Sequence, residues 1–204
     1  MKKIICLIIS ALLLTISFVG CVPQPEEGIW QYGENYKNYS DMIDYARFAE
    51  RLTGEDSPNK TDSLENGWNV GGTDLGFPIY DYGKNTMYYA FGDTFSTPNQ
   101  SGTWRSNVLA ISNNYDIKNG FAIDDFYKGG SGVAKAMTEG KHNVQLDTYE
   151  VTKIPTGGIV IGNNMYIFYM SIRRWNGWLV NYCGVIKSNT EKLNFERVYD
   201  LTWA

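Results

Sequence analysis

The stretch TMYYAFGDTF, residues 86–95, decides the fold because a second stretch of the same kind, NMYIFYMSIR, occupies residues 164–173. Both are rich in the aromatic and β-branched residues that are typical of strands. A Gly/Asn turn and an upstream apolar segment precede each stretch, and another apolar segment follows it, at 104–112 and at 178–188. The sequence therefore predicts two copies of a three-stranded antiparallel meander.

Repeated meanders of this kind are typical of the blades of a β-propeller. The strands are apolar on both faces, as at residues 165–170, which fits sheets that are covered on both sides. We therefore predict an all-β fold. Residues 67–204 are expected to belong to a β-propeller domain and to form its first two to three blades. The sequence stops at 199–204 inside what reads as a further element, so we expect the domain to be incomplete at its C-terminus.

The N-terminus has the pattern of an exported lipoprotein. Residues 1–20 join two lysines to an apolar run, which is typical of a signal peptide. The four residues FVGC at 18–21 resemble a bacterial lipobox, although Phe18 stands where leucine is usual. Cys21 is therefore the predicted lipidation site, and the protein is expected in the bacterial cell envelope, touching the membrane through this lipid only. An ordinary signal peptide and an uncleaved anchor are the alternatives.

Two further segments precede the domain. Residues 21–39 read as a polar tether between the anchor and the fold. Residues 40–66 read as a lead-in of helix and loop, because Ser40 can cap a helix over 41–52 and Gly54 can end it. We predict this one short helix before the strands begin.

The composition narrows the classes of function. The chain has 204 residues, a formal net charge of −4 and 43% hydrophobic residues, as expected of a globular unit with its own core. No cluster of lysine and arginine follows the first residues, so a nucleic-acid partner is not predicted. Cys6 leaves with the signal and Cys21 would carry lipid, so Cys183 stands alone, and we interpret it as a small buried hydrophobe.

Two aspartates near corresponding parts of successive strands are the candidate chemical groups. Asp74 lies in GGTDLGFP at 71–78 and Asp93 in YAFGDTF at 89–95, so both carboxylates could converge on one surface. Two carboxylates in an aromatic pocket are the minimal equipment for glycoside hydrolysis: one protonates the leaving oxygen while the other activates water or attacks the sugar. The alternative is that both only hydrogen-bond loop amides. Asp93 corresponds to Ser171 in the second copy, which argues against an architectural role.

Aromatic and basic residues gather after the second strand of each meander. Trp104 and Arg105 follow the first, and Arg173 and Trp175 follow the second. Tryptophan faces stack on sugar rings and arginines bind hydroxyls or acidic groups, so a glycan cleft is one interpretation. The other is that the tryptophans pack between sheets and the arginines are solvated. For Trp178 we favour packing.

Other catalytic schemes have little basis in the sequence. His142 is the single histidine and has no partner at ligand spacing, so we predict neither a zinc site nor a Ser-His-Asp triad and interpret His142 as a surface residue. The acidic pairs at 124–125 and 147–150 lack the alternating spacing of a calcium loop. The segment GGSG at 129–132 lacks the Lys-Ser/Thr of a phosphate loop. No metal and no cofactor are therefore predicted.

Several motifs in a fixed order resemble one family. They are GTDLGFP at 72–78, YAFGDTF at 89–95, WRSN at 104–107, IPTGG at 154–158 and YIFYMS at 166–171. Together they resemble the domain-of-unknown-function 4185 family, some of whose members are bacterial endo-D-arabinanases. The resemblance runs from about residue 69 to residue 188.

The resemblance implies a five-bladed β-propeller with a glycan site at one end of its axis. It places the two family aspartates on Asp74 and Asp93, as an acid/base pair without added metal, and it adds Asn107 of the WRSN motif to the candidate sugar contacts. The expected function is a lipid-anchored glycoside hydrolase acting on a cell-envelope or environmental polysaccharide. The alternatives are a non-catalytic glycan-binding propeller and an inactive truncated copy.

Overall fold

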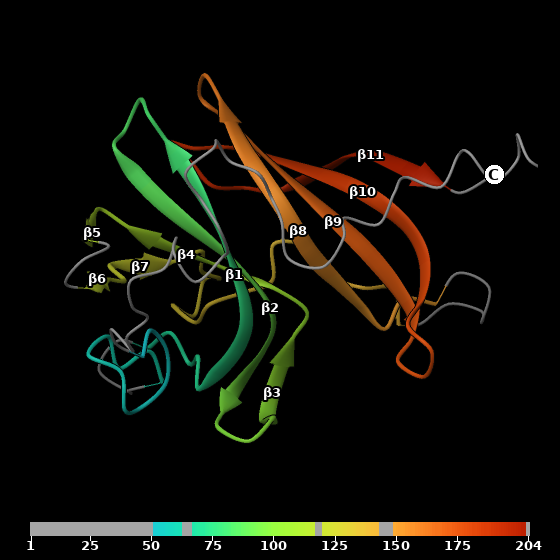
Figure 1. Ribbon diagram of the computed structural model, residues 1–204, viewed down its shortest axis with the longest axis horizontal. Coiled ribbons are helices and arrows are strands. Elements are labelled where there is room, and N and C mark those ends of the chain that lie inside the picture. The colour runs from blue at the N-terminus through green and yellow to red at the C-terminus, as the bar shows by residue number, and fades with distance from the viewer. Residues whose placement is uncertain (1–50, 63–66, 117–119, 143–148, 203–204) are drawn as a thin grey trace, which may run out of the picture. The chain divides into compact units, whose positions relative to one another are not determined.

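The fold follows the alternation of apolar segments and Gly/Asn turns along the chain. A computed structural model describes residues 51–62, 67–116, 120–142 and 149–202, which lie in the unit spanning Ala49–Ala204 (Figure 1). The predicted signal peptide, the predicted tether and the predicted helix up to residue 50 lie outside the described residues. Arg51 and Leu52, the last two residues of that predicted helix, are not helical, and the described part of the chain contains strands but no helix. Accordingly, no described helix is long and apolar enough to cross a membrane.

The first meander forms the core of a five-stranded antiparallel sheet. Strand β1 (Gly72–Asp81) pairs with β2 (Thr86–Thr97). The two halves of β2 pair with β3 (Ser101–Arg105) and β4 (Val108–Ser112), so β3 and β4 act as one interrupted strand. Strand β7 (Asp125–Phe126) pairs with β4 at the sheet's edge. A separate two-stranded ribbon, β5 (Asn114–Asp116) with β6 (Gly120–Ala122), lies between β4 and β7 in the chain.

The second meander forms a four-stranded antiparallel sheet in simple chain order. It runs from β8 (Thr152–Ile161) through β9 (Asn164–Arg174) and β10 (Leu179–Asn189) to β11 (Glu196–Thr202). If β3 and β4 are counted as one interrupted strand, each sheet contains the predicted three-stranded meander and one further strand. This strand is β7 in the first sheet and β11 in the second, and the sequence repeat does not predict either. The all-β prediction is confirmed, and the ring of a propeller remains a prediction.

The two sheets pack face to face around one apolar cluster. The cluster joins Ile79, Tyr88 and Leu109 of the first sheet to Ile167 of the second. Its other buried members are Ala90, Tyr127, Met137, Met165, Tyr169 and Ile186. Strand β8 can lie against β1 because Gly158 has no side chain: a Cβ there would come within 2.4 Å of the Ile79 Cδ1 atom. Burial of these side chains is the main force that holds the sheets together.

The opposite faces of the two sheets differ. The far face of the first sheet is covered by the segments around residues 68–70 and 123–134, which form a second apolar cluster with Phe91, Val108 and Phe126. Neither of these two apolar clusters of the described residues extends over the far face of the second sheet, where Phe168 and Ile159 are 45% and 48% exposed. The prediction that both faces are covered therefore holds for the first sheet alone within the described residues.

Candidate active site

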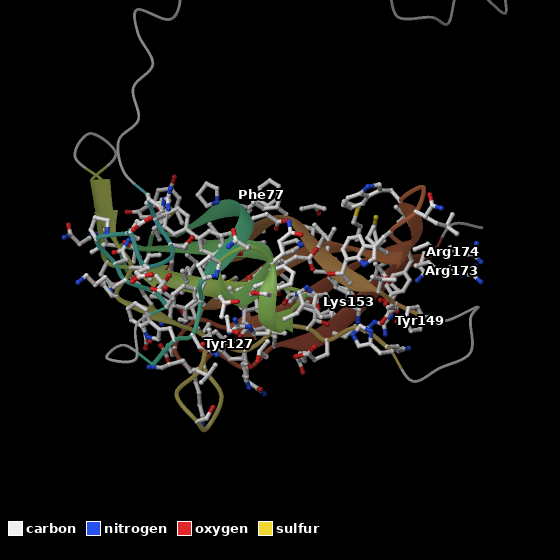
Figure 2. All side chains as sticks on the ribbon, turned by 90° about the horizontal axis from the view of Figure 1, so that it is seen from below. Phe77, Tyr127, Tyr149, Lys153, Arg173 and Arg174 are labelled. Carbon is white, nitrogen blue, oxygen red and sulfur yellow. The ribbon has the colours of Figure 1, made fainter. Side chains whose placement is uncertain are left out.

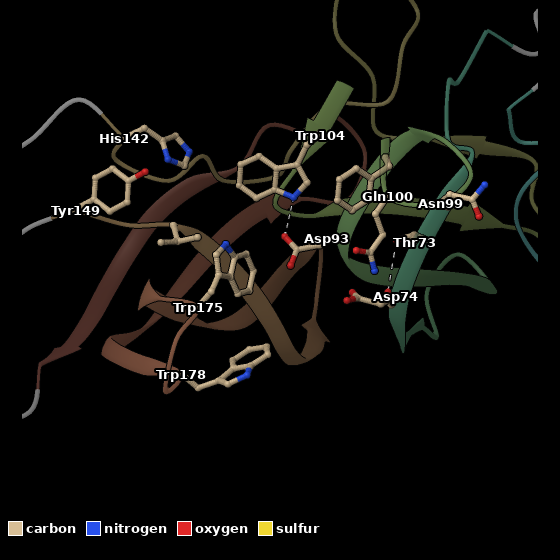
Figure 3. Close-up of a pocket in the computed structure, with 13 residues that line it drawn as sticks. Thr73, Asp74, Asp93, Asn99, Gln100, Trp104, His142, Tyr149, Trp175 and Trp178 are labelled. Carbon is tan, nitrogen blue, oxygen red and sulfur yellow. Dashed lines mark hydrogen bonds between the residues drawn. The ribbon is translucent and has the colours of Figure 1, made fainter. Parts of the chain in front are cut away.

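A cavity of about 750 Å³ opens where the C-terminal half of β2 meets the beginning of β8. The first sheet supplies residues from the start of β1, the end of β2 and β3, and the second supplies the approach to β8 and the β9–β10 turn (Figure 3). The lining residues are Gly72, Thr73, Asp74, Asp93, Phe95, Asn99, Gln100, Trp104, His142, Tyr149, Val151, Trp175 and Trp178. Asp74 and Asp93 are thus brought together in one cavity, as the expectation of convergence required.

Asp74 sits on an irregular part of β1. The pairing of β1 with β2 shifts register on both sides of Leu75, whose backbone φ of 61° lies in the left-handed region that costs a side-chain-bearing residue about 1 kcal/mol or more. Bulges of this kind re-aim a side chain and occur next to active sites. Asp74 is directed toward Gly92 of β2, where a Cβ would come within 2.3 Å of the Asp74 Oδ1 atom. The glycine therefore leaves the space that this carboxylate occupies.

Asp93 is held from both sheets. The indole Nε1–H of Trp104 donates to Asp93 Oδ1 at 2.9 Å, and the hydroxyl of Thr152 donates to the same oxygen at 2.8 Å. Trp104 comes from β3, whereas Thr152 is fully buried at the start of β8. The position of the half-buried Asp93 carboxylate therefore depends on the packing of one sheet against the other.

The two aspartates differ in the groups that shift their pKa values. Burial raises the pKa of Asp74, and the negative charge of Asp93 raises it further, against backbone hydrogen bonds that lower it. Burial also raises the pKa of Asp93, but hydrogen bonds from Thr152 and Trp104 favour its ionised form. No side-chain donor among the described residues plays that part for Asp74. The pKa values of both aspartates are thus raised, and the side-chain donors Thr152 and Trp104 distinguish the surroundings of Asp93 from those of Asp74.

An aromatic wall continues from Asp93 toward the second sheet. The rings of Trp104 and His142 lie 5.7 Å apart, and those of His142 and Tyr149 lie 6.0 Å apart, both edge to face. The sequence does not predict Thr152, His142 or Tyr149 as site residues, because no motif spacing links them to Asp93. A single threonine at the start of a strand and a single histidine carry no sequence signal of their own.

Arg105 and Asn107 do not line the cavity. The Arg105 guanidinium is buried and donates to the carbonyls of Ala134 at 3.0 Å and Asn69 at 2.7 Å. Asn107 is fully buried, donates to the carbonyls of Thr138 and Lys153, and accepts from the amides of Met137 and Thr138. Both side chains bond backbone groups of the segment at 134–138; Arg105 also bonds the carbonyl of Asn69, and Asn107 also bonds that of Lys153 in β8. We therefore assign them to support of the site and not to sugar contact.

The basic and aromatic candidates of the second meander lie on β9 and on the turn that follows it. Trp175 and Trp178 both line the cavity, and Trp178 is 58% exposed, so the packing interpretation of Trp178 was wrong. Figure 2 shows Arg173 beside Arg174 at one end of the described unit. Arg173 is half-buried on β9 and is not among the described residues that line the cavity.

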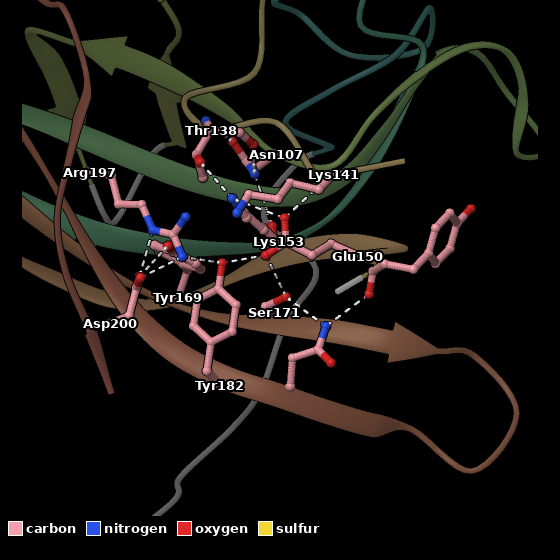
Figure 4. A network of polar contacts seen from close by, with 12 residues as sticks. Asn107, Thr138, Lys141, Glu150, Lys153, Tyr169, Ser171, Tyr182, Arg197 and Asp200 are labelled. Carbon is pink, nitrogen blue, oxygen red and sulfur yellow. Dashed lines mark hydrogen bonds and ion pairs between the residues drawn. The ribbon is translucent and has the colours of Figure 1, made fainter. Parts of the chain in front are cut away.

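A buried polar network includes Glu150 and Lys153, which are close to Thr152 in the chain (Figure 4). Glu150 and Lys153 are almost fully buried and form an ion pair of 3.3 Å between Oε2 and Nζ. Glu150 also accepts hydrogen bonds from the hydroxyls of Tyr182 and Ser171 and from the amide of Lys141, at 2.8 Å for the last. Burial opposes the charge, yet these donors and Lys153 hold the pKa of Glu150 below its usual range. For Lys153 burial is the largest influence, and it lowers the pKa of the ammonium group.

Fold and cavity together define a class: an all-β protein in which two antiparallel meander sheets share a cavity lined by carboxylates and aromatic rings. The chain belongs to the family described as "Domain of unknown function (DUF4185)", whose model matches residues 56–204. The family predicted from the ordered motifs is therefore confirmed.

One solved structure, from Bacteroides ovatus ATCC 8483 and provisionally described as a hydrolase, matches over 62% of this chain and 36% of its own, with a TM-score of 0.43 and 9% sequence identity. This chain thus spans well under half of that protein's length. No curated protein matches the chain.

Proposed function

We propose that this protein is a glycoside hydrolase of the cell envelope that cleaves a polysaccharide, in the manner of an endo-D-arabinanase. One observation carries the proposal: Asp74 and Asp93, from paired strands, reach one aromatic-lined cavity at a point where the backbone of β1 is strained. Most glycoside hydrolases use a pair of carboxyl groups, and tryptophan rings offer apolar faces on which sugars can stack.

Each aspartate has a separate role in this reaction. Asp74 keeps its proton longer than an ordinary aspartate and donates it to the oxygen of the leaving sugar. Asp93, held by Trp104 and Thr152, acts as the carboxylate that activates water or attacks the sugar. The reaction as proposed needs no cofactor, because one side chain supplies the proton and the other either activates the attacking water or attacks the sugar itself.

The direct test is hydrolysis. The full-length protein is incubated with D-arabinan and with other furanose polymers, and new reducing ends are counted against an Asp93→Asn variant. We expect the wild type to release reducing ends from at least one polymer and the variant to release them about 10²–10⁴-fold more slowly. Binding of a polymer without release, unchanged in Asp74→Asn and Asp93→Asn, would identify a non-catalytic glycan-binding protein instead.

Thr152 gives a pH-dependent prediction. Its hydroxyl favours the ionised form of Asp93, so Thr152→Val is expected to raise the pKa of Asp93. Activity that needs ionised Asp93 is lost as the pH falls through this pKa, so the acidic limb of the kcat/KM profile should move to higher pH. Thr152→Ser should restore the wild-type limb. Thr190→Val is the matched control, because Thr190 is a buried threonine whose Oγ1 atom bonds no described residue. If the acidic limb does not move in Thr152→Val, Thr152 does not influence the pKa of Asp93.

We further propose that Cys21, which lies outside the described residues, carries a lipid and anchors the exported protein to a membrane. FVGC at 18–21 and the apolar run before it support this proposal. Cys21→Ser is expected to move the protein from the membrane fraction of the producing bacterium to the soluble fraction. Fractionation with detection of the protein in both fractions measures this, and an unchanged distribution would favour an uncleaved peptide anchor.

A further inference from the structure

The turn between β9 and β10 presents two tryptophans at the rim of the cavity. Trp175 and Trp178 are 46% and 58% exposed, although large aromatic side chains normally contribute to a core. Their rings lie 5.6 Å apart at 83°, so each supports the other edge-on. In Figure 3 Trp175 lies between Asp93 and Trp178. The pair belongs to neither apolar cluster of the described residues.

The backbone of this turn holds Trp178 in an unfavourable conformation. Its φ of 47° follows a φ of 77° at Gly177, and the Trp178 amide donates to the Trp175 carbonyl at 3.3 Å. A left-handed φ costs a bulky residue about 1 kcal/mol or more. Strain of this kind with no gain in burial is typical of a functional position. The turn therefore fixes the orientation of an indole that the core does not use.

We infer that Trp175 and Trp178 form an outer subsite on which a sugar chain stacks beyond the bond that is cleaved. This inference rests on the proposed function and assigns it a substrate class: a polymer long enough to reach from Asp74 and Asp93 on the first sheet to the β9–β10 turn on the second. No lysine or arginine is among the described residues that line the cavity. Contact with the faces of the aromatic rings, and not ion pairing, therefore holds the sugar polymer at this rim.

Such a subsite makes activity depend on the length of the substrate. A polymer that covers the tryptophans gains their stacking, whereas the shortest oligosaccharide that the wild type cleaves gains less. Trp175→Ala and Trp178→Ala are each expected to lower kcat/KM on soluble D-arabinan about tenfold, as loss of one aromatic contact implies, with little change on that shortest oligosaccharide. Tyr82→Ala is the matched control, since Tyr82 is an aromatic residue that is 87% exposed and does not line the cavity.

Binding is measured alongside turnover. Calorimetric titration of D-arabinan into the Asp93→Asn protein, with and without each tryptophan substitution, should show about tenfold weaker binding when either tryptophan is absent. Equal losses on long and short substrates, or no loss on either, would overturn the subsite. If the wild type binds D-arabinan without cleaving it, the hydrolase proposal fails and the binding titration alone decides the subsite. If it neither binds nor cleaves any of the polymers tested, both proposals fail.

Discussion

Asp93→Asn is expected to lower kcat on the cleaved polymer by about 10²–10⁴-fold, the usual contribution of a positioned acid or base. Asparagine keeps the size of the side chain and an oxygen for the donors Trp104 and Thr152, so the sheets should pack unchanged. The loss then reflects the missing charge. Initial rates of reducing-end release measure it, with thermal unfolding as the check on the fold.

Asp74→Asn should give a loss of similar size that depends on the leaving group. An aryl glycoside whose phenol leaves without protonation does not need a general acid, so its cleavage should be much less affected than that of the polymer. Asp56→Asn is the control for both substitutions, because Asp56 is an exposed aspartate paired with Arg51 on the surface. Wild-type turnover in Asp93→Asn, or equal losses on both substrates in Asp74→Asn, would contradict the assigned roles.

Glu150→Ala should destabilise the protein more than any surface substitution. It would leave the Lys153 ammonium, 4% exposed, without its carboxylate partner, and breaking a buried pair in this way costs about 3–5 kcal/mol of unfolding free energy. Removing the exposed partner Asp56 of Arg51 should cost at most about 1 kcal/mol. Urea unfolding of the two variants against the wild type compares these costs. A Glu150→Ala variant as stable as Asp56→Ala would show that the pair is not buried.

The same network makes stability depend on pH. Because the pKa of Glu150 is lowered in the folded state, its contribution is present above 4.5, the ordinary value, and is lost as the pH falls through the lower folded pKa. The unfolding free energy of the wild type should therefore fall on acidification below this point more steeply than that of the variant Glu150→Gln. Parallel pH dependences would contradict the lowered pKa.

The sequence predicted the meanders well because their signal is local. Alternating apolar segments and Gly/Asn turns at 83–85 and 162–164 determine strand order by themselves. Strand β7, with two residues, is too short to carry a pattern, and β11 lies beyond the repeated unit. The predicted helix concerns mainly residues outside the described part of the chain.

The site could be predicted only where neighbouring strands bring its residues together. Asp74 and Asp93 lie on paired strands, so their convergence follows from the local meander. Thr152 reaches Asp93 from 59 residues away through the packing of two sheets, which no spacing reveals. Arg105 was read as a sugar contact from its residue type. Its burial against the Asn69 and Ala134 carbonyls depends on loops whose course only the fold defines.

The central claim is that Asp74 and Asp93 form one catalytic pair, and carboxyl titration by NMR of the aspartate-labelled protein tests it most directly. The charge of Asp93 contributes to the raised pKa of Asp74, so Asp93→Asn should lower the pKa of Asp74, whereas Asp56→Asn should leave it unchanged. A pKa of Asp74 that is ordinary in the wild type, or that does not move in Asp93→Asn, would contradict the pair.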